Sequence, residues 1–265
     1  PISRFPVDRK QHDKTGVIVV WERPTSARPD FGQYYASIDP VSEGKTTTSD
    51  SLCSIFVYKN AVEVIRETVA GDTEQFIEKD KIVAAWCGRF DDINKTHERL
   101  ELLIEWYNAW TIVENNISLF IQHMIARRKQ RYLVPKQQIL FLKDLGSNKS
   151  VYQEYGWKNT GTLFKSHLIS YAIEFIREVI DEELDDSGNV ITQTLGVERI
   201  PDQMLLKEML AYYPGLNVDR LVAFGALIAF VKIQQSNRGY SKRRESEDKS
   251  LVNSENLYKL KYSPF

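Results

Sequence analysis

Three acidic residues stand at the ends of apolar segments, where an isolated carboxylate is costly. Asp39 ends the apolar and aromatic run 34–39, Glu114 ends the run 110–114, and Asp219 lies in the first turn of an almost wholly apolar segment, 218–233. If the two runs are neighbouring strands and the last segment is a helix beside them, the three carboxylates converge at one sheet edge, where repulsion and desolvation oppose ionisation. Divalent cations relieve both the repulsion and the cost of desolvation.

Hard cations such as Mg²⁺ and Mn²⁺ prefer oxygen ligands, and a pair of them can activate water and stabilise the leaving oxygen of a phosphodiester. The pattern of Asp39, Glu114 and Asp219 is therefore typical of a metal-dependent phosphodiesterase site. Each acid also has a structural interpretation, because acids at strand ends and in first helical turns commonly cap backbone amides or interact with the helix dipole. Spacing alone leaves both interpretations open.

The elements that must position these acids follow an α/β order. Four strand-like runs without an intervening helix predict an antiparallel section of one sheet: 34–39, 52–58, 61–69 and 82–90. A helix over 92–108, capped by Asp91 or Asp92, then leads to the strand 110–114 and a helix over 117–128, an order that favours a parallel addition to the sheet. We expect a mixed central sheet flanked by helices.

The second half of the chain is predicted to be mainly helical. Its expected elements are a strand over 139–142, a helix over 162–183, a turn over 185–188, a strand-like run over 190–194, and helices over 201–212 and 218–233. Residues 1–32, with one strand-like run over 16–21, are interpreted as an arm or linker. Residues 33–236 form the expected compact domain, and 237–265 a flexible polar and basic tail.

Composition restricts the function classes. The chain has 265 residues, a formal net charge of −1 and 42% hydrophobic residues, which is typical of a globular protein without a uniformly basic surface. Any DNA binding must then use local patches. Cys53 and Cys87 lack CxxC spacing, which predicts buried free thiols rather than a zinc site and fits a reducing compartment. No apolar run is long enough to predict a membrane helix.

Four short motifs occur in an order that resembles one nuclease family. They are the run 35–40 with Glu43, Gly44 and 50–52; Val113–Asn116; Tyr155–Thr160; and Asn217–Ala223. Together they cover residues 33–234, and they are similar to the motifs of the C-terminal nuclease domain of phage large terminase subunits, which has a ribonuclease H-like fold. The resemblance implies an endonuclease that cuts double-stranded viral DNA during genome packaging, in the cytoplasm of the infected bacterial host.

The resemblance also implies a ligand set. Asp39 would bridge two divalent cations, Mg²⁺ or Mn²⁺, while Glu114 and Asp219 would each complete one site. Many family members carry two adjacent aspartates in the third motif, whereas Val218 occupies the first of these places here. Asp50 or Asp202 could supply a fourth ligand, although Asp202, beside Pro201, also fits the structural role of a first-turn helix acid.

The family joins this domain to a packaging ATPase. Gly44, Lys45 and Thr46 mimic the end of a phosphate-binding loop, but Asp39 stands where the first glycine is required. The resemblance therefore implies an isolated nuclease domain, with the missing ATPase domain, the portal and the small terminase subunit as implied partners beside double-stranded DNA.

Basic residues after the helix 117–128 are the expected DNA contacts. These are Arg127, Arg128, Lys129 and Arg131, with Lys158 and Lys165 as a second group. Basic residues at a helix C-terminus can instead complement the helix dipole. Two other functions fit the same residues: a junction resolvase on this fold, and a catalytically silent module that binds DNA or a portal protein. Binding of Mn²⁺ through the carboxylates would distinguish the silent module from the nucleases.

Overall fold

The structure is a computed structural model of the 265-residue chain. It describes residues 13–44, 51–67, 73–139, 154–158, 162–213, 216–237 and 241–246. By contacts the chain divides into two units: Pro1–Asn60 with Asp80–Arg238, and Ala61–Lys79 with Gly239–Phe265. All the residues discussed as a site below belong to the first unit.

A five-stranded mixed sheet forms the centre of the first unit. Its order is β1 (Val19–Val20), β6 (Lys81–Gly88), β3 (Cys53–Lys59), β2 (Tyr34–Asp39) and β7 (Trp110–Val113). All neighbouring pairs are antiparallel except β2 and β7, which run parallel. The expected antiparallel section with one parallel addition is thus confirmed for β2, β3, β6 and β7.

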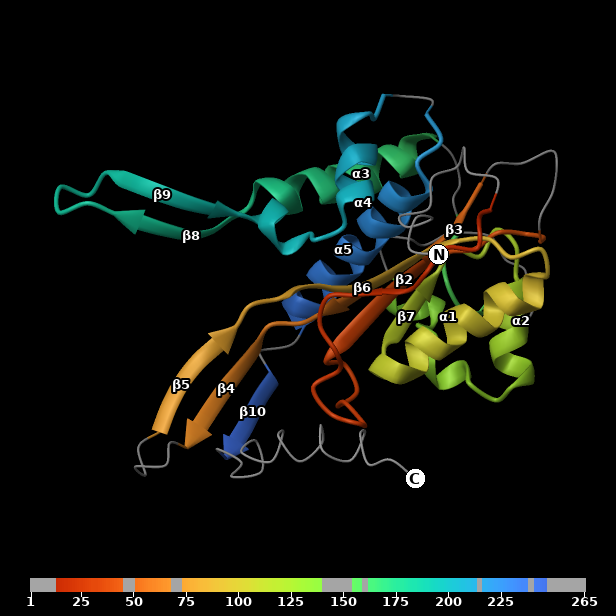
Figure 1. Cartoon of the computed structure of the whole chain (residues 1–265), viewed down its shortest axis with the longest axis horizontal. Coiled ribbons are helices and arrows are strands. Elements are labelled where there is room, and N and C mark those ends of the chain that lie inside the picture. Colours follow the sequence, from red (N-terminus) through yellow and green to blue (C-terminus); the bar gives the residue numbers. More distant parts are fainter. Residues whose placement is uncertain are drawn as a thin grey trace, which may run out of the picture. The chain divides into compact units, whose positions relative to one another are not determined.

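Helices cover both faces of this sheet. Helices α1 (Ile93–Tyr107) and α2 (Leu119–Ala126) lie on one face, and α3 (Thr162–Arg177), α4 (Gln203–Leu210) and α5 (Asp219–Asn237) lie on the other (Figure 1). The side chain of Asp92 caps α1 by accepting a hydrogen bond from the amide of Asn94, as expected for an acid at this position.

The alternation of side chains along β2 separates the two cores. Tyr34 packs on Tyr107 of α1 with ring centroids 5.1 Å apart, whereas Tyr35 packs on Phe230 of α5, also at 5.1 Å. Side chains two positions apart on a strand share a face. Asp39 therefore belongs to the same face as Tyr35, the face covered by α5.

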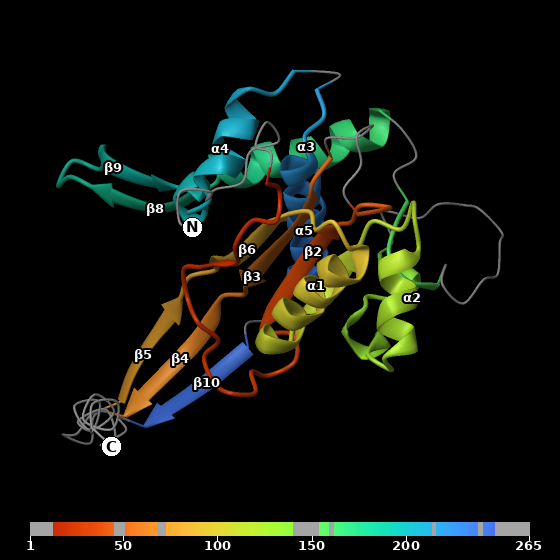
Figure 2. The ribbon, with the colours of Figure 1, turned by 45° about the vertical axis from the view of Figure 1, so that its right-hand side comes forward.

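The predicted helix over 162–183 is wrong at its C-terminal end. Helix α3 ends at Arg177, and the chain continues into a hairpin of β8 (Val179–Leu184) and β9 (Val190–Leu195) around the predicted turn. The hairpin extends away from α3 and α4 in both views (Figures 1 and 2). A valine and an isoleucine, Val179 and Ile180, open the strand, and β-branched residues favour extended backbone.

The second unit contains a three-stranded sheet of β10 (Ser241–Ser246), β4 (Val62–Glu67) and β5 (Thr73–Glu78), in that order. Two expectations are therefore wrong. The run 61–69 does not extend the central sheet, and the tail is not unstructured over 241–246, because β10 pairs in parallel with β4 along six residue pairs.

Three short 3₁₀ helices complete the described elements: Gln130–Tyr132, Lys136–Gln138 and Gly196–Arg199. Ile139 follows the second of them and is not part of a strand, while the rest of the expected strand, 140–142, lies outside the described residues. Among the helices in the described ranges, none is long and apolar enough to cross a membrane.

Candidate active site at the carboxyl ends of β2 and β7

Asp39 and Glu114 leave two adjacent parallel strands at the same edge. Ile38 is paired with Val113 in the register of β2 and β7, and the amide of Glu114 donates a hydrogen bond of 2.9 Å to the carbonyl oxygen of Ile38. Parallel strands present their carboxyl ends together, so the two acids that follow this pair are neighbours. The expectation of adjacent strands is confirmed.

The charge environment of Asp39 joins it to the other two acids. Burial raises the pKa of Asp39 well above its usual range, and the charges of Glu114 and Asp219 raise it further, together with a side-chain hydrogen bond to Glu114. The Lys165 ammonium acts in the opposite direction and lowers this pKa. The structure thus brings Asp39, Glu114, Asp219 and Lys165 into one electrostatic cluster.

Asp219 is buried at the start of α5 and faces the start of β3. Its Oδ2 accepts a hydrogen bond of 3.0 Å from the backbone amide of Leu52. The next residue of the helix, Arg220, lies 3.9 Å from Oε2 of Glu208 in α4, whose Oε1 accepts the amide of Leu221 at 2.9 Å. Contacts from β3 and α4 therefore fix the first turn of α5 and the position of its carboxylate.

Glu114 is fixed by the segment that contains the Gly-Trp motif. The amide of Trp157 donates to the carbonyl of Val113 at 2.9 Å, and Glu114 forms a parallel bridge with Trp157. Gly156 has φ +72°, and a Cβ there would lie 2.3 Å from the carbonyl oxygen of Val113. Only glycine satisfies both conditions without displacing the backbone. The Asn116 amide also donates to Oε1 of Glu114 at 2.6 Å.

Arg89, which sequence reasoning did not single out, positions the loop after β2. It is buried at the end of β6, and its guanidinium donates to the carbonyl oxygens of Glu43, Gly44 and Ser51. These carbonyls flank residues 45–50 on both sides. Asp50, the first candidate for a fourth ligand, lies in that segment and is outside the described residues. A single arginine after a strand carries no signal for such a role.

Asp202, the second candidate, caps a helix. Its Oδ1 accepts the amides of Met204 at 2.8 Å and Leu205 at 3.1 Å at the start of α4. The structural interpretation offered for this residue accounts for these contacts, since an N-cap aspartate satisfies the free amides of a first turn.

The two cysteines are free, as expected. Cys53 is buried, and Cys87 is half-buried with its Sγ 3.3 Å from Oγ of Ser54. Burial raises the pKa of Cys87 to about 11, which keeps the thiol protonated at neutral pH.

The basic run after α2 is divided between two environments. Arg127 and Lys129 form ion pairs with the buried Glu101 of α1, and His123 joins them with its Nε2 2.5 Å from Oε2 of Glu101. Arg128 and Arg131 instead line an open pocket beside β7. The sequence treats these residues as one patch, whereas the structure pairs Arg127 and Lys129 with Glu101 and leaves Arg128 and Arg131 at the pocket.

The second group of predicted DNA contacts is also divided. Lys158 is half-buried and lines a small crevice with Asn115 and Tyr155. Asn115 is the residue that follows Glu114 in the chain. Lys165 donates to the carbonyl oxygen of Leu216 at 2.9 Å and acts electrostatically on Asp39. Lys165 thus belongs to the acid cluster, where it offsets part of the negative charge.

The donor set of the cluster suits a hard cation. Asp39, Glu114 and Asp219 offer only carboxylate oxygens. Burial and the charges of the other two acids raise the pKa of Asp39, and the positive charge of a cation would oppose this rise. In the described ranges, no three acidic, histidine or cysteine side chains are already arranged as a complete metal site.

Comparison with known proteins adds no family. No protein-family model matches the chain, and no curated protein matches it. The functional assignment therefore depends on the site itself.

Proposed function

We propose that this chain is a metal-dependent endonuclease that cuts double-stranded DNA, with a ribonuclease H-like fold and a relationship to the nuclease domain of phage large terminases. The observation that carries the proposal is the position of Asp39 beside Glu114 at one edge of the mixed sheet, where the charges of Glu114 and Asp219 both act on Asp39. Burial and the charges of Glu114 and Asp219 make ionisation of Asp39 unfavourable in the folded protein, and a bound cation would offset both effects.

The three carboxylates would hold two divalent cations, Mg²⁺ or Mn²⁺. When bound, such cations supply an activated water and stabilise the leaving oxygen of a phosphodiester. The protein itself contributes orientation. The segment 155–157 fixes Glu114, the Leu52 amide orients Asp219, and Lys165 places a positive charge near Asp39. Because burial and the two neighbouring acids raise the pKa of Asp39, binding of a cation should strengthen as the pH rises.

Two measurements test the proposal. Calorimetric titration of Mn²⁺ should give carboxylate-dependent binding to the wild type and much weaker binding to Asp39→Asn. In a plasmid assay with Mn²⁺, the wild type should nick and linearise supercoiled DNA and Asp39→Asn should not. Asp92→Asn is the matched control, because Asp92 only caps α1 and its loss leaves the cluster intact.

Failure of these measurements has distinct meanings. If the wild type binds no Mn²⁺, or if Asp39→Asn binds it equally well, the three acids are structural and the catalytically silent DNA- or portal-binding module is the better assignment. If Mn²⁺ binds and four-way junctions are cut in preference to linear duplexes, the junction resolvase replaces the packaging nuclease.

A further inference from the structure

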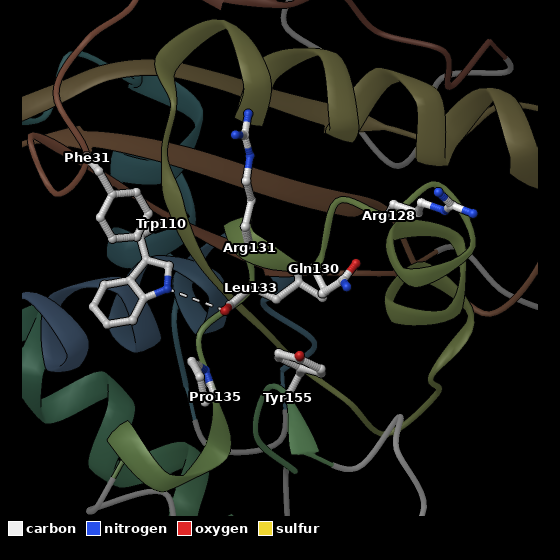
Figure 3. Close-up of a pocket in the computed structure, with 8 residues that line it drawn as sticks. All are labelled: Phe31, Trp110, Arg128, Gln130, Arg131, Leu133, Pro135 and Tyr155. Carbon is white, nitrogen blue, oxygen red and sulfur yellow. Dashed lines mark hydrogen bonds between the residues drawn. The ribbon is translucent and has the colours of Figure 1, made fainter.

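An open pocket lies beside β7, on the opposite end of that strand from Glu114. It has a volume of about 420 Å³, and its lining includes Phe31, Trp110, Arg128, Gln130, Arg131 and Tyr155. Figure 3 shows the aromatic pair Phe31 and Trp110 on one side, Arg128 on the other, and Gln130 and Arg131 between them. Volumes from about 300 to 1,000 Å³ are usual for small-ligand sites.

The positive charge of this pocket is not neutralised within the described structure. Arg127 and Lys129 are paired with Glu101, but no carboxylate in the described ranges forms an ion pair with Arg128 or Arg131. The Arg131 guanidinium lies 4.6 Å from the centre of the Tyr132 ring and donates to its hydroxyl at 2.5 Å, which holds it in place. The pocket is therefore lined by two arginine side chains whose charge no carboxylate of the described structure pairs with.

Arg128 occupies a backbone position that normally favours glycine. It has φ +58°, and the residues around it close helix α2 with two hydrogen bonds, from the Arg128 amide to Ile125 and from the Lys129 amide to Met124. This is the C-terminal arrangement in which glycine is the usual residue at the left-handed position. An arginine here is unfavourable for the backbone, and its side chain lines the pocket, which indicates a role in ligand binding.

The aromatic side of the pocket is suited to a flat ring. Phe31 is 51% exposed, and its ring lies 5.5 Å from that of the buried Trp110 at an angle of 52°. Trp110 is fixed from behind by Phe230 of α5, with ring centroids 5.5 Å apart. A half-exposed phenylalanine on a rigid support is a platform on which a nucleobase can stack.

We propose that this pocket binds one nucleotide of a DNA strand, with the base on Phe31 and the phosphate at Arg128 and Arg131. The pocket is connected to the candidate active site, because Asn115, the residue after Glu114, donates through Nδ2 to the carbonyl oxygen of Tyr155 at 2.9 Å. Trp110 and Glu114 are separated by about 13 Å of extended strand.

The relation to cleavage rests on the proposed function, but nucleotide binding can be tested without it. The binding of a short fluorescein-labelled oligothymidylate, measured by anisotropy in EDTA, should weaken at least about 5-fold for Phe31→Ala and for Arg131→Ala. Arg128→Gly should weaken binding similarly while leaving thermal stability unchanged or higher, because glycine suits the backbone there. Arg127→Ala is the matched control and should change affinity less than about 2-fold, because its guanidinium is paired with Glu101.

Further probes identify the ligand. An abasic oligonucleotide should bind the wild type as weakly as oligothymidylate binds Phe31→Ala, and free thymidine monophosphate should bind more weakly than the oligonucleotide. If Arg127→Ala weakens binding as much as Arg131→Ala, or if Phe31→Ala and the abasic probe have no effect, the pocket is only part of a diffuse basic surface and the proposal is wrong. Equal affinity for free nucleotide overturns the assignment to a DNA strand.

The two proposals fail separately. Asp39→Asn should bind the oligonucleotide like the wild type, since Asp39 is not part of the pocket. A wild type that binds in EDTA but never cuts DNA would leave the nucleotide pocket standing and remove the nuclease. If the wild type cuts DNA but the pocket variants bind the oligonucleotide normally, the nuclease assignment stands and the nucleotide pocket is wrong.

Discussion

The backbone amide of Leu52 donates a hydrogen bond of 3.0 Å to Oδ2 of Asp219, although the residues are 167 positions apart in the chain. Asp219 is therefore held by the start of β3 as well as by its own helix. This contact distinguishes the two roles that an acid in a first helical turn can have. A carboxamide can accept the same hydrogen bond but cannot replace the charge.

Asp219→Asn should leave the fold intact and abolish cleavage. The side-chain oxygen of asparagine still accepts the Leu52 amide, so the free energy of unfolding should change by less than about 1 kcal/mol. Removal of the charge should lower Mn²⁺-dependent plasmid cleavage more than about 100-fold, or about 2.7 kcal/mol in activation free energy. Urea denaturation and a cleavage time course measure the two effects. A variant that cuts at nearly the wild-type rate would exclude Asp219 from the site.

Asp39→Asn should stabilise the metal-free protein at alkaline pH. Burial and the charges of Glu114 and Asp219 raise the pKa of Asp39 in the folded state, so its contribution to stability is present at low pH and is lost as the pH rises through that raised value. The neutral asparagine avoids this loss. Thermal unfolding in EDTA between pH 5 and pH 9 should show a stabilisation that grows with pH, whereas Asp186→Asn, in the exposed turn between β8 and β9, should show none.

Excess Mn²⁺ should make the wild type more stable than Asp39→Asn, the reverse of their order in EDTA. A ligand that binds only the folded state raises its stability, so the wild type should gain melting temperature while Asp39→Asn gains little. Equal gains for the two proteins would place the binding of Mn²⁺ elsewhere.

Gly156→Ala should be strongly destabilising. Its Cβ would meet the Val113 carbonyl at 2.3 Å in addition to the unfavourable φ of +72°, and we expect a loss of at least about 2 kcal/mol. Gly188→Ala is the control, since Gly188 has φ +83° but nothing within 4 Å of a Cβ, and the backbone term alone is about 1 kcal/mol. Equal losses in urea denaturation would show that the Val113 contact is unimportant.

Glu101→Ala should destabilise the packing of α1 on α2. Although burial opposes ionisation of Glu101, hydrogen bonds from Lys129 and His123 and the charges of Lys129 and Arg127 hold its pKa below the usual range. Removing this buried acceptor should reduce the free energy of unfolding by about 1–3 kcal/mol, because His123 and Arg127 lose their partner and Lys129 keeps only Glu105. Glu105→Ala breaks only the partly exposed pair with Lys129, and we expect less than about 1 kcal/mol.

The sequence predicts the positions of the acids along the chain better than it predicts their contacts. Asp39 and Glu114 are recognisable because strand ends follow from local alternation, and the order of strand, helix and strand implies parallel neighbours. The contact between Asp219 and Leu52, in contrast, depends on the packing of α5 against the sheet, which no local pattern encodes. Likewise, the sequence could not show that Arg127 and Lys129 are ion-paired while Arg128 and Arg131 line the pocket. Their partner, Glu101, lies on a different helix.

The errors in the fold have the same origin. The alternation of apolar and polar residues in β4 is compatible with any half-buried sheet, so it could not show that this strand leaves the central sheet to pair with β5 and β10. At the end of α3, no glycine or proline marks the change at Arg177. The turn at 185–188 is recognisable in the sequence. It can be assigned to a hairpin, however, only when the segments on both sides of it are recognised as strands.

The distance between Leu52 and Asp219 along the chain also determines when the molecule can be completed during synthesis. At about 5–20 residues per second, a ribosome needs roughly 10 to 30 s to add the 167 residues between them. β3 and β7 are completed within that interval, but until its end the sheet face that α5 covers has no partner. A nascent chain therefore carries an exposed apolar surface and an unassembled set of acids, and any nuclease activity is delayed until α5 has been synthesised.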